Sequence, residues 1–373
     1  MMSDVNHAAL ARLRTAMSSA QADLLIVDQG ELLAWLTGYS VSETLYRACL
    51  VPVQGDPWMV LRQLDEAPCR QSSWLREIVT FDDHQSPWQC VADSIAAKGY
   101  GSGRIAADFN SYGMTVHNWR QLQKCLPGSH WVDMTGVSDR LRQVKFPQEL
   151  AYLQQAADIA DRAMSALAEQ VRGGWRVRDA AALAAACFLR EGADTGETGP
   201  IVCSRSDNGF LHNSNHEHRL AAGDILHVEL IPKVRHYSAR IMRPIFIGQP
   251  TEQQQQVARQ LIELQDRQLA MMTPNTPATE VDALLREGVM AAGLRRAYGN
   301  VTGCALGLYT RTPRPSDFSY CFTPAANWQL EENMVFHMYA SAQGIAFSET
   351  VQVTPQGGKR LSRLPRQAFI APY

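Results

Sequence analysis

A carboxylate in an apolar run and an arginine shortly after it are the first residues of this sequence that could do chemistry. Glu229 lies inside the run 225–231, which predicts a buried strand, and Arg240 precedes a second apolar run at 241–247. A carboxylate in such a strand is destabilising unless it meets a cation or has a raised pKa. We therefore expect Glu229 and Arg240 to pair across facing strands. Glu229 could then act as a nucleophile or a base, or the pair could be only structural.

The composition describes a globular chain with little net charge. Of its 373 residues, 46% are hydrophobic and 19% charged, which allows a large core and excludes disorder of the whole chain. With 35 basic against 37 acidic residues, the net charge of −2 lacks the electrostatic footprint of a nucleic-acid binder. There is no long apolar run, no N-terminus resembling a secretory signal, and no CxxC pair among eight scattered cysteines. We expect a cytoplasmic protein with reduced thiols that binds neither nucleic acid nor membranes.

The order of predicted helices and strands differs between the two halves of the chain, and the second half contains Glu229 and Arg240. Up to about residue 138, short apolar runs at 22–27, 48–53, 57–61 and 104–108 alternate with helical stretches, which is typical of an α/β layer structure. Beyond it, helical spacing at 150–171 and 177–190 is followed by strands at 225–231 and 241–247. Two helices at 251–272 and 278–292 come next, and then a strand-rich tail at 334–355. This order predicts an α+β unit that begins near residue 139.

Several motifs together carry a family resemblance. They are DRLRQVK at 139–145 with Glu149, His212 eleven residues before the Gly-Asp pair at 223–224, and the run 237–248. The tail adds ENMVF at 332–336 and SETVQVT at 348–354, and the first half adds LTG at 36–38. In this order the motifs resemble the creatinase/aminopeptidase superfamily over nearly the whole chain. The resemblance implies an α/β creatinase-type N-terminal domain at 1–138 and an α+β pita-bread catalytic domain at 139–373.

The chain departs from this family where its peptidases bind metal. The resemblance implies two metal ions held by two Asp, one His and two Glu. Carried over one position at a time, these ligands fall on Glu229, Arg240, Cys304, Tyr339 and Ser348. Only one of the five is still a carboxylate, and a cation at Arg240 would repel metal. We therefore predict no dinuclear metal centre and no other cofactor.

A reaction without metal is still open to this scaffold. The resemblance includes creatinase and ectoine hydrolase, which implies hydrolysis of non-peptide C–N bonds without a metal ion. His212 occupies the place of the creatinase histidine that acts as general acid or base, and an ordinary imidazole pKa of about 6.5 suits that role. The alternative is that His212 only caps the polar loop at 213–218. An ectoine-hydrolase-like member would be expected to use Glu229 as its nucleophile.

The remaining predicted residues would bind substrate. The second catalytic histidine of creatinase falls on Arg311, which could hold a substrate carboxylate or lie on the surface. Tyr339 could donate a hydrogen bond or belong to the core, and Cys304 could be a nucleophile or a small buried side chain. Arg240 and Glu349 complete this set in the second domain. The resemblance implies a dimer in which the N-terminal domain reaches over the partner's site. The candidate contributors there are Tyr46, Arg47 and Arg62, and the alternative is that they are ordinary surface residues.

Three functions are compatible with these observations. The first is a metal-independent hydrolase of a C–N bond in a small polar amino-acid-like compound, such as a guanidino acid, a cyclic amidine or an amide. The second is a metallopeptidase of the Xaa-Pro dipeptidase type, and the third is an inactive member that binds a small ligand. The predicted partners are a small-molecule substrate and a second copy of the chain in a homodimer.

Overall fold

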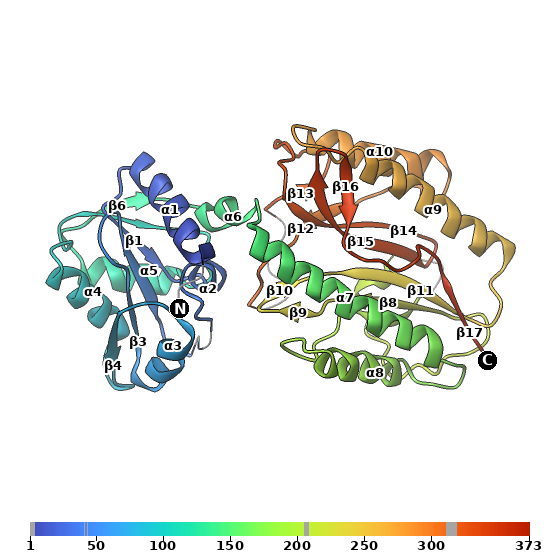
Figure 1. Cartoon of the computed structure of the whole chain (residues 1–373), viewed down its shortest axis with the longest axis horizontal. Coiled ribbons are helices and arrows are strands. Elements are labelled where there is room, and N and C mark those ends of the chain that lie inside the picture. Colours follow the sequence, from blue (N-terminus) through green and yellow to red (C-terminus); the bar gives the residue numbers. More distant parts are fainter. Residues whose placement is uncertain (1–3, 41, 43, 205–208, 311–318) are drawn as a thin grey trace. The chain divides into compact units, whose positions relative to one another are not determined.

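The computed structural model describes residues 4–40, 42, 44–204, 209–310 and 319–373. The chain divides into two compact units, unit 1 at Met1–Arg142 and unit 2 at Gln143–Tyr373 (Figure 1). The predicted domain boundary after residue 138 falls inside α6 (Val137–Arg142), the last helix of unit 1.

Unit 1 is a layered α/β structure. Its sheet has the strand order β4-β3-β2-β1-β5-β6, formed by β1 (Leu24–Val27), β2 (Ala48–Pro52), β3 (Trp58–Arg62), β4 (Glu77–Phe81), β5 (Arg104–Ala107) and β6 (His130–Asp133). The antiparallel pairs are β1 with β2 and β2 with β3, and the other neighbours are parallel. The helices of unit 1 before α6 are α1 (Asp4–Ser19), α2 (Gly30–Thr37), α3 (Glu66–Ser72), α4 (Pro87–Ala97) and α5 (Val116–Cys125), with a 3-10 turn at Gln63–Asp65.

Unit 2 is built on one large, mostly antiparallel sheet. The strand order is β13-β12-β14-β15-β11-β8-β7, with β16 on β15 and β17 on β11. These strands are β7 (Ile201–Ser204), β8 (Ile225–Leu230), β11 (Ile241–Ile247), β12 (Gly303–Ala305), β13 (Cys321–Phe322), β14 (Val335–Ala342), β15 (Ile345–Thr354), β16 (Gly357–Arg360) and β17 (Phe369–Ala371). A small hairpin, β9 (Lys233–Val234) and β10 (Tyr237–Ser238), joins β8 to β11.

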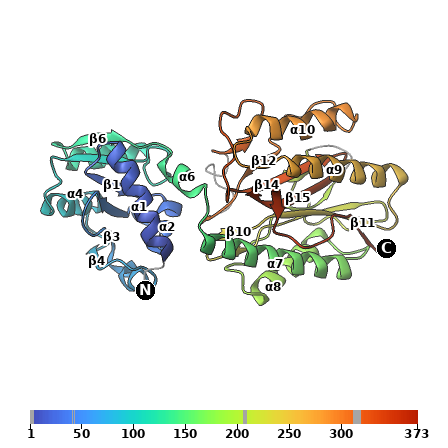
Figure 2. The same cartoon turned by 45° about the horizontal axis from the view of Figure 1, so that its top comes forward.

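Two pairs of helices cover the sheet of unit 2. The first pair is α7 (Pro147–Gln170) and α8 (Val177–Arg190), and the second is α9 (Glu252–Ala270) and α10 (Ala278–Ala291). Figures 1 and 2 show strands between the two pairs, yet strand register places the side chains that pack on both pairs on one and the same face of the sheet. Pro147 begins α7, where its missing N–H has no helical partner to lose. Thr251 and Gln254 form a reciprocal capping box at the start of α9. Both helix pairs therefore begin where the sequence provides a start signal.

Each helix pair packs on alternate side chains of the strands. Leu226, Val228 and Leu230 of β8 belong to the core formed with α7 and α8, and Ala340 and Phe347 belong to the core formed with α9. Because successive side chains of a strand point to opposite faces, the residues between these positions face away from the helices. That second face of the sheet carries the polar residues described below. Among the described residues, no helix is both long and apolar enough to cross a membrane.

Candidate active site

The site is centred on Glu229, in the middle of β8. Its backbone N–H donates to the carbonyl oxygen of Pro200, 2.9 Å away, and only 6% of the residue is exposed. Gly199 allows this close approach, since a Cβ at that position would lie 2.7 Å from the carbonyl oxygen of Glu229 and 2.9 Å from its Cγ. Burial raises the pKa of the Glu229 carboxyl, and the charges of Arg240 and His212 oppose that rise. Glu229 is therefore a carboxylate with increased basicity, positioned by a rigid strand.

Arg240 is the charge partner of Glu229, as the sequence predicts. Its guanidinium Nη1 lies 3.9 Å from Oε1 of Glu229, and both side chains are about nine-tenths buried. The backbone of Arg240 is fixed at both ends by Thr350, whose hydroxyl accepts from its N–H at 2.7 Å and donates to its carbonyl at 2.9 Å. The ring of Tyr309 lies 6.0 Å from the guanidinium carbon. The cation is thus held beside the carboxylate rather than in solvent.

Strand register brings the other predicted positions to the same face. Met242 lies opposite both Glu229 and Ser348, Ser348 lies opposite Tyr339, and Cys304 lies opposite the residue two before Tyr339. Directly opposed residues, and residues two apart on one strand, share a face of a sheet. We call this surface the Glu229 face and define it by Glu229, Met242, Ser348, Tyr339, Cys304 and two histidines, His227 and His337.

The sequence patterns do not predict a role for either of the two histidines. His227, two residues before Glu229, is fully buried, packs edge-on against Phe210 at 5.0 Å, and has neither ring nitrogen hydrogen-bonded to a described residue. His337 stacks on Tyr339 at 5.1 Å. Burial lowers the pKa of His227 to about 3, and burial together with the charges of Arg240 and His227 lowers the pKa of His337 well below its ordinary value. Both imidazoles are therefore neutral hydrogen-bonding groups at physiological pH. His227 lies two residues before Glu229 in the same strand, and this spacing could have placed it on the same face. Nothing in the sequence indicates which residues His337 lies opposite in the sheet.

His212 is exposed to solvent at the end of the 3-10 turn η2 (Phe210–His212). Phe210, at the start of that turn, is buried with Met242 of the Glu229 face. His212 is also one of the groups whose charge lowers the pKa of Glu229. The structure therefore brings the two predicted catalytic residues, His212 and Glu229, into one region.

On this face Tyr339 is partly buried and Cys304 is buried. Burial raises the pKa of the Tyr339 phenol, a hydrogen bond with the side chain of Asn300 opposes the rise, and its backbone N–H donates to the carbonyl of Thr302 at 3.1 Å. Cys304 is 2% exposed. Tyr339 is thus a neutral phenol that can donate a hydrogen bond.

Glu349 does not belong to the Glu229 face. It follows Ser348 in β15, so its side chain points to the opposite face, and it is 0% exposed. Its carboxylate accepts a hydrogen bond from Nη2 of Arg243 at 2.7 Å, with Arg366 and Arg360 at 3.3 and 3.5 Å. The predicted role of Glu349 in substrate binding disagrees with this placement. Three guanidinium groups surround the Glu349 carboxylate on the face of the sheet opposite to the Glu229 face, so its role is structural.

The other predicted substrate-binding residues lie elsewhere. Arg311 is outside the described residues. Tyr46 and Arg47 line a cavity of about 550 Å³ within unit 1, where they hydrogen-bond to the side chain and the carbonyl of Asp28 at 3.1 and 3.0 Å. Arg62 forms an ion pair with Asp83, which lines the same cavity. These three residues are therefore grouped around one pocket of unit 1.

The donor set of the Glu229 face does not fit a dinuclear metal site. Of the five family positions, only Glu229 supplies a hard anionic oxygen, and Arg240 places a positive charge beside it. The described residues contain one group of three His, Cys or acidic side chains close enough to share an ion, and it is Cys203, His218 and Asp224. That group does not include any of the five positions. We therefore derive no step of the reaction through a metal ion at Glu229.

Comparison with protein families identifies the chain. The model of metallopeptidase family M24 matches residues 151–355, more than half of the chain. The chain belongs to family M24. The creatinase/prolidase N-terminal domain matches residues 10–144. The predicted two-domain creatinase/prolidase fold, with an M24 catalytic domain of pita-bread type, is therefore confirmed.

M24 relatives with different activities are similar to this chain. An Xaa-Pro dipeptidase of Pyrococcus furiosus is 27% identical over 61% of this chain, a match that spans slightly less than two thirds (65%) of that protein. The ectoine hydrolase of Halomonas elongata is 22% identical over 96% of this chain and 95% of its own length. The crystal structure of a prolidase from Thermococcus sibiricus superposes with a TM-score of 0.85 at 20% identity, covering 99% of this chain and 100% of the prolidase. These similarities support an M24 hydrolase with the prolidase fold.

Proposed function

We propose that this M24 protein hydrolyses a C–N bond of a small polar amino-acid-like compound without a metal ion at the Glu229 face. The observation that carries the proposal is the Glu229–Arg240 pair, in which a buried carboxylate faces a cation at 3.9 Å where the family's peptidases would have two acidic ligands. A guanidino acid, a cyclic amidine such as ectoine, or an amide would suit such a site, because each offers a polar electrophilic carbon bonded to nitrogen.

In the proposed reaction Glu229 acts as general base. Its raised pKa makes it a stronger acceptor for a proton of water, which then adds to the carbon of the scissile bond. Arg240 keeps the carboxylate ionised and attracts an anionic substrate group. His212, at the solvent-exposed end of η2, donates a proton to the leaving nitrogen, so that water is added across the C–N bond. Neutral His227, His337 and Tyr339 offer hydrogen bonds to the bound substrate.

A ligand screen followed by kinetics tests the proposal. Thermal shift with ectoine, creatine and Xaa-Pro dipeptides would select compounds, and release of amine would be measured with and without a chelator. We expect chelator-resistant turnover that falls at least 100-fold in Glu229→Gln and His212→Ala. His216→Ala, an exposed histidine of the same loop, is the matched control and should retain activity. Full activity in both site variants would refute the assignment.

Isotope labelling distinguishes the base from a nucleophile. In a single turnover in H₂¹⁸O, a base at Glu229 places the label only in the product. Label found in the Glu229 carboxylate would instead show a covalent intermediate whose bond to Glu229 is hydrolysed at the carboxyl carbon. The homodimer remains a prediction, which light scattering after size exclusion measures directly.

Xaa-Pro dipeptides form the second candidate substrate class, because the Pyrococcus relative is named for that activity. Hydrolysis of such a dipeptide that a chelator abolishes would favour this alternative.

A further inference from the structure

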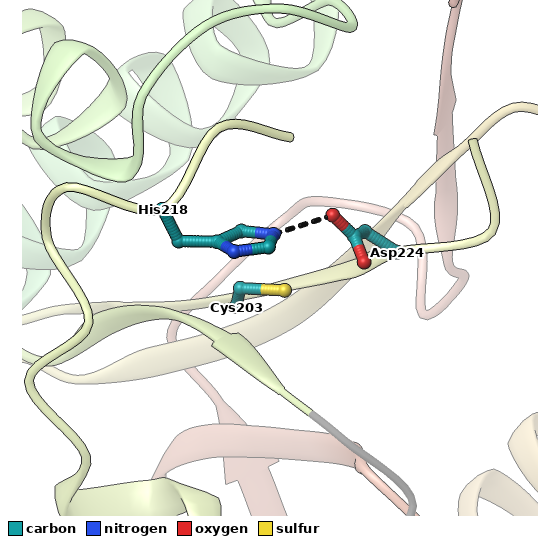
Figure 3. Close-up of side chains that lie close together, drawn as sticks. All are labelled: Cys203, His218 and Asp224. Atoms are coloured by element: carbon teal, nitrogen blue, oxygen red, sulfur yellow. Dashed lines mark hydrogen bonds and ion pairs between the residues drawn. The ribbon is translucent and has the colours of Figure 1, made fainter. Parts of the chain in front are cut away.

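A second cluster of reactive side chains lies in unit 2, away from the Glu229 face. Cys203 is on β7, Asp224 directly precedes β8, and His218 is in the loop that joins η2 to β8. Figure 3 shows the three side chains converging from these separate segments. Val202 packs with Phe210 and Met242, whereas Cys203, one residue later, packs in the core with α7 and α8. The cluster is therefore on the opposite side of the strand from the candidate active site.

The ligand atoms of this cluster are already close together. The sulfur of Cys203, a ring nitrogen of His218 and a carboxylate oxygen of Asp224 all lie within 4.8 Å of one another. Nε2 of His218 is 2.7 Å from Oδ2 of Asp224. In a tetrahedral zinc site, ligands about 2.0–2.3 Å from the ion are about 3.3–3.6 Å apart. Side-chain movements of about 1 Å would thus bring all three into the first coordination sphere of one ion.

We propose that Cys203, His218 and Asp224 bind one Zn²⁺ ion. One thiolate, one imidazole and one carboxylate make a donor set that a borderline-soft ion such as Zn²⁺ accepts. Cys203 is 4% exposed, while the side chains of His218 and Asp224 are 34% and 24% exposed, which leaves solvent access for a water as fourth ligand. Binding releases the thiol proton and keeps the imidazole neutral.

Hydrogen bonds with the surrounding chain already hold all three ligand-bearing residues in place. The side-chain amide of Asn215 bonds to both the N–H and the carbonyl of Cys203, at 2.9 and 2.7 Å. The carbonyl of His218 accepts from the N–H of Val177 at the start of α8, 3.0 Å away. Oδ2 of Asp224 also accepts from the N–H of Ala221 at 2.8 Å. The hydrogen bond from Ala221 explains why an aspartate stands at position 224. It does not explain why the thiol of Cys203 and the imidazole of His218 lie beside that aspartate.

The consequence of zinc binding would be to fix a loop. His218 is six residues after His212, in the loop that follows η2. An ion bound by His218, Cys203 of β7 and Asp224 at the start of β8 would attach this loop, and with it His212, to the edge of the sheet. The proposed ion would thus act by holding this loop, and its binding does not depend on the proposed hydrolase activity.

Zinc titration of the full chain tests the proposal. Chelator-treated protein would be titrated with Zn²⁺ by calorimetry and with Co²⁺ by absorbance, where a thiolate ligand gives a charge-transfer band in the near ultraviolet. We expect one equivalent of metal, at least tenfold weaker binding in Cys203→Ser and in His218→Ala, and loss of the Co²⁺–thiolate band in Cys203→Ser. Cys187→Ser, a half-buried free cysteine of α8, is the matched control and should bind like the wild type.

Thermal stability provides the second readout. Zn²⁺ at a hundredfold excess over its Kd should raise the Tm of unit 2 by about 5–10 °C in the wild type and the Cys187 control. Zn²⁺ should not raise the Tm of His218→Ala. Because His218 lies in a partly exposed loop, this variant still tests the proposal if Cys203→Ser does not fold. The proposal is wrong if the wild type binds no zinc, or if zinc binding survives in both site variants.

Discussion

Replacing Arg240 by methionine should destabilise unit 2 in a pH-dependent way. The substitution preserves most of the side-chain volume but leaves the buried Glu229 carboxylate without the cation 3.9 Å away. Removing one partner of a buried ion pair is costly because the other charge stays uncompensated. The pH dependence therefore reports directly on the charge state of Glu229.

The magnitude follows from the distance and the burial. Two unit charges about 4 Å apart interact by about 4 kcal/mol at the effective dielectric constant of ~20 that suits protein sites. The 3.9 Å separation is longer than a hydrogen bond, and both side chains retain some exposure. We therefore expect a loss of about 2–3 kcal/mol when Glu229 is ionised.

The sign of the pH dependence follows from the direction of the pKa shift. Burial already raises the pKa of Glu229, and removal of Arg240 would raise it further. A carboxyl with a raised folded-state pKa contributes stability that is fully present below its unfolded pKa and is lost as the pH rises through the folded pKa. Arg240→Met should therefore cost little near pH 4 and its full amount at pH 8.

Thermal unfolding of unit 2 measures this effect. At about 2–4 °C per kcal/mol, the Tm of Arg240→Met should fall by about 4–12 °C at pH 8. Adding Glu229→Gln should recover most of the loss, because the uncompensated charge is gone. Arg259→Met, an exposed arginine of α9, is the control and should change the Tm little. An equal loss at both pH values, or no recovery in the double variant, would refute the reasoning.

Three further predictions concern neighbouring residues. Because burial lowers the pKa of His227 to about 3, the stability it contributes is present above its ordinary pKa of 6.5 and is lost as the pH falls toward 3, by up to about 1.4 kcal/mol per pH unit. His227→Leu should flatten that slope in urea unfolding at pH 4 and 7. Arg243→Met should cost about 3 kcal/mol of unfolding free energy, because the buried Glu349 carboxylate loses its hydrogen-bonded guanidinium and keeps only the more distant Arg366 and Arg360. The double variant with Glu349→Gln should regain part of this loss. Gly199→Ala, whose Cβ would lie 2.9 Å from Cγ of Glu229, should lower kcat at least tenfold on any substrate found, in a chain that circular dichroism shows to be folded.

The sequence predicts much of unit 2 because local patterns and motif spacing act together there. The expected strand at 241–247 coincides with β11, and the expected helix at 177–190 with α8. The eleven-residue interval between Glu229 and Arg240 spans the β9–β10 hairpin, and the resulting ion pair was expected from charge compensation alone. Each of these features depends on residues that are close together in the chain, so its pattern can be recognised in a single sequence.

What the sequence did not predict depends on strand parity and register. Glu349 adjoins Ser348, yet adjacent residues of a strand point to opposite faces, so strand parity argues against a place for Glu349 on the Glu229 face. His337 joins the Glu229 face only because β14 lies between β12 and β15, and that pairing connects residues far apart in the chain. The cluster of Cys203 and His218 depends likewise on how the loop after η2 folds back on β7.

The most direct test of the central claim is the metal content of Cys203→Ser/His218→Ala protein after exposure to Zn²⁺, Mn²⁺ or Co²⁺. The double substitution removes the proposed zinc site, so any remaining ion would report on the Glu229 face. With Arg240 beside the one remaining carboxylate, we predict no bound metal by mass spectrometry of the washed protein. Two equivalents of metal per chain that disappear with Glu229→Gln would contradict a metal-independent site.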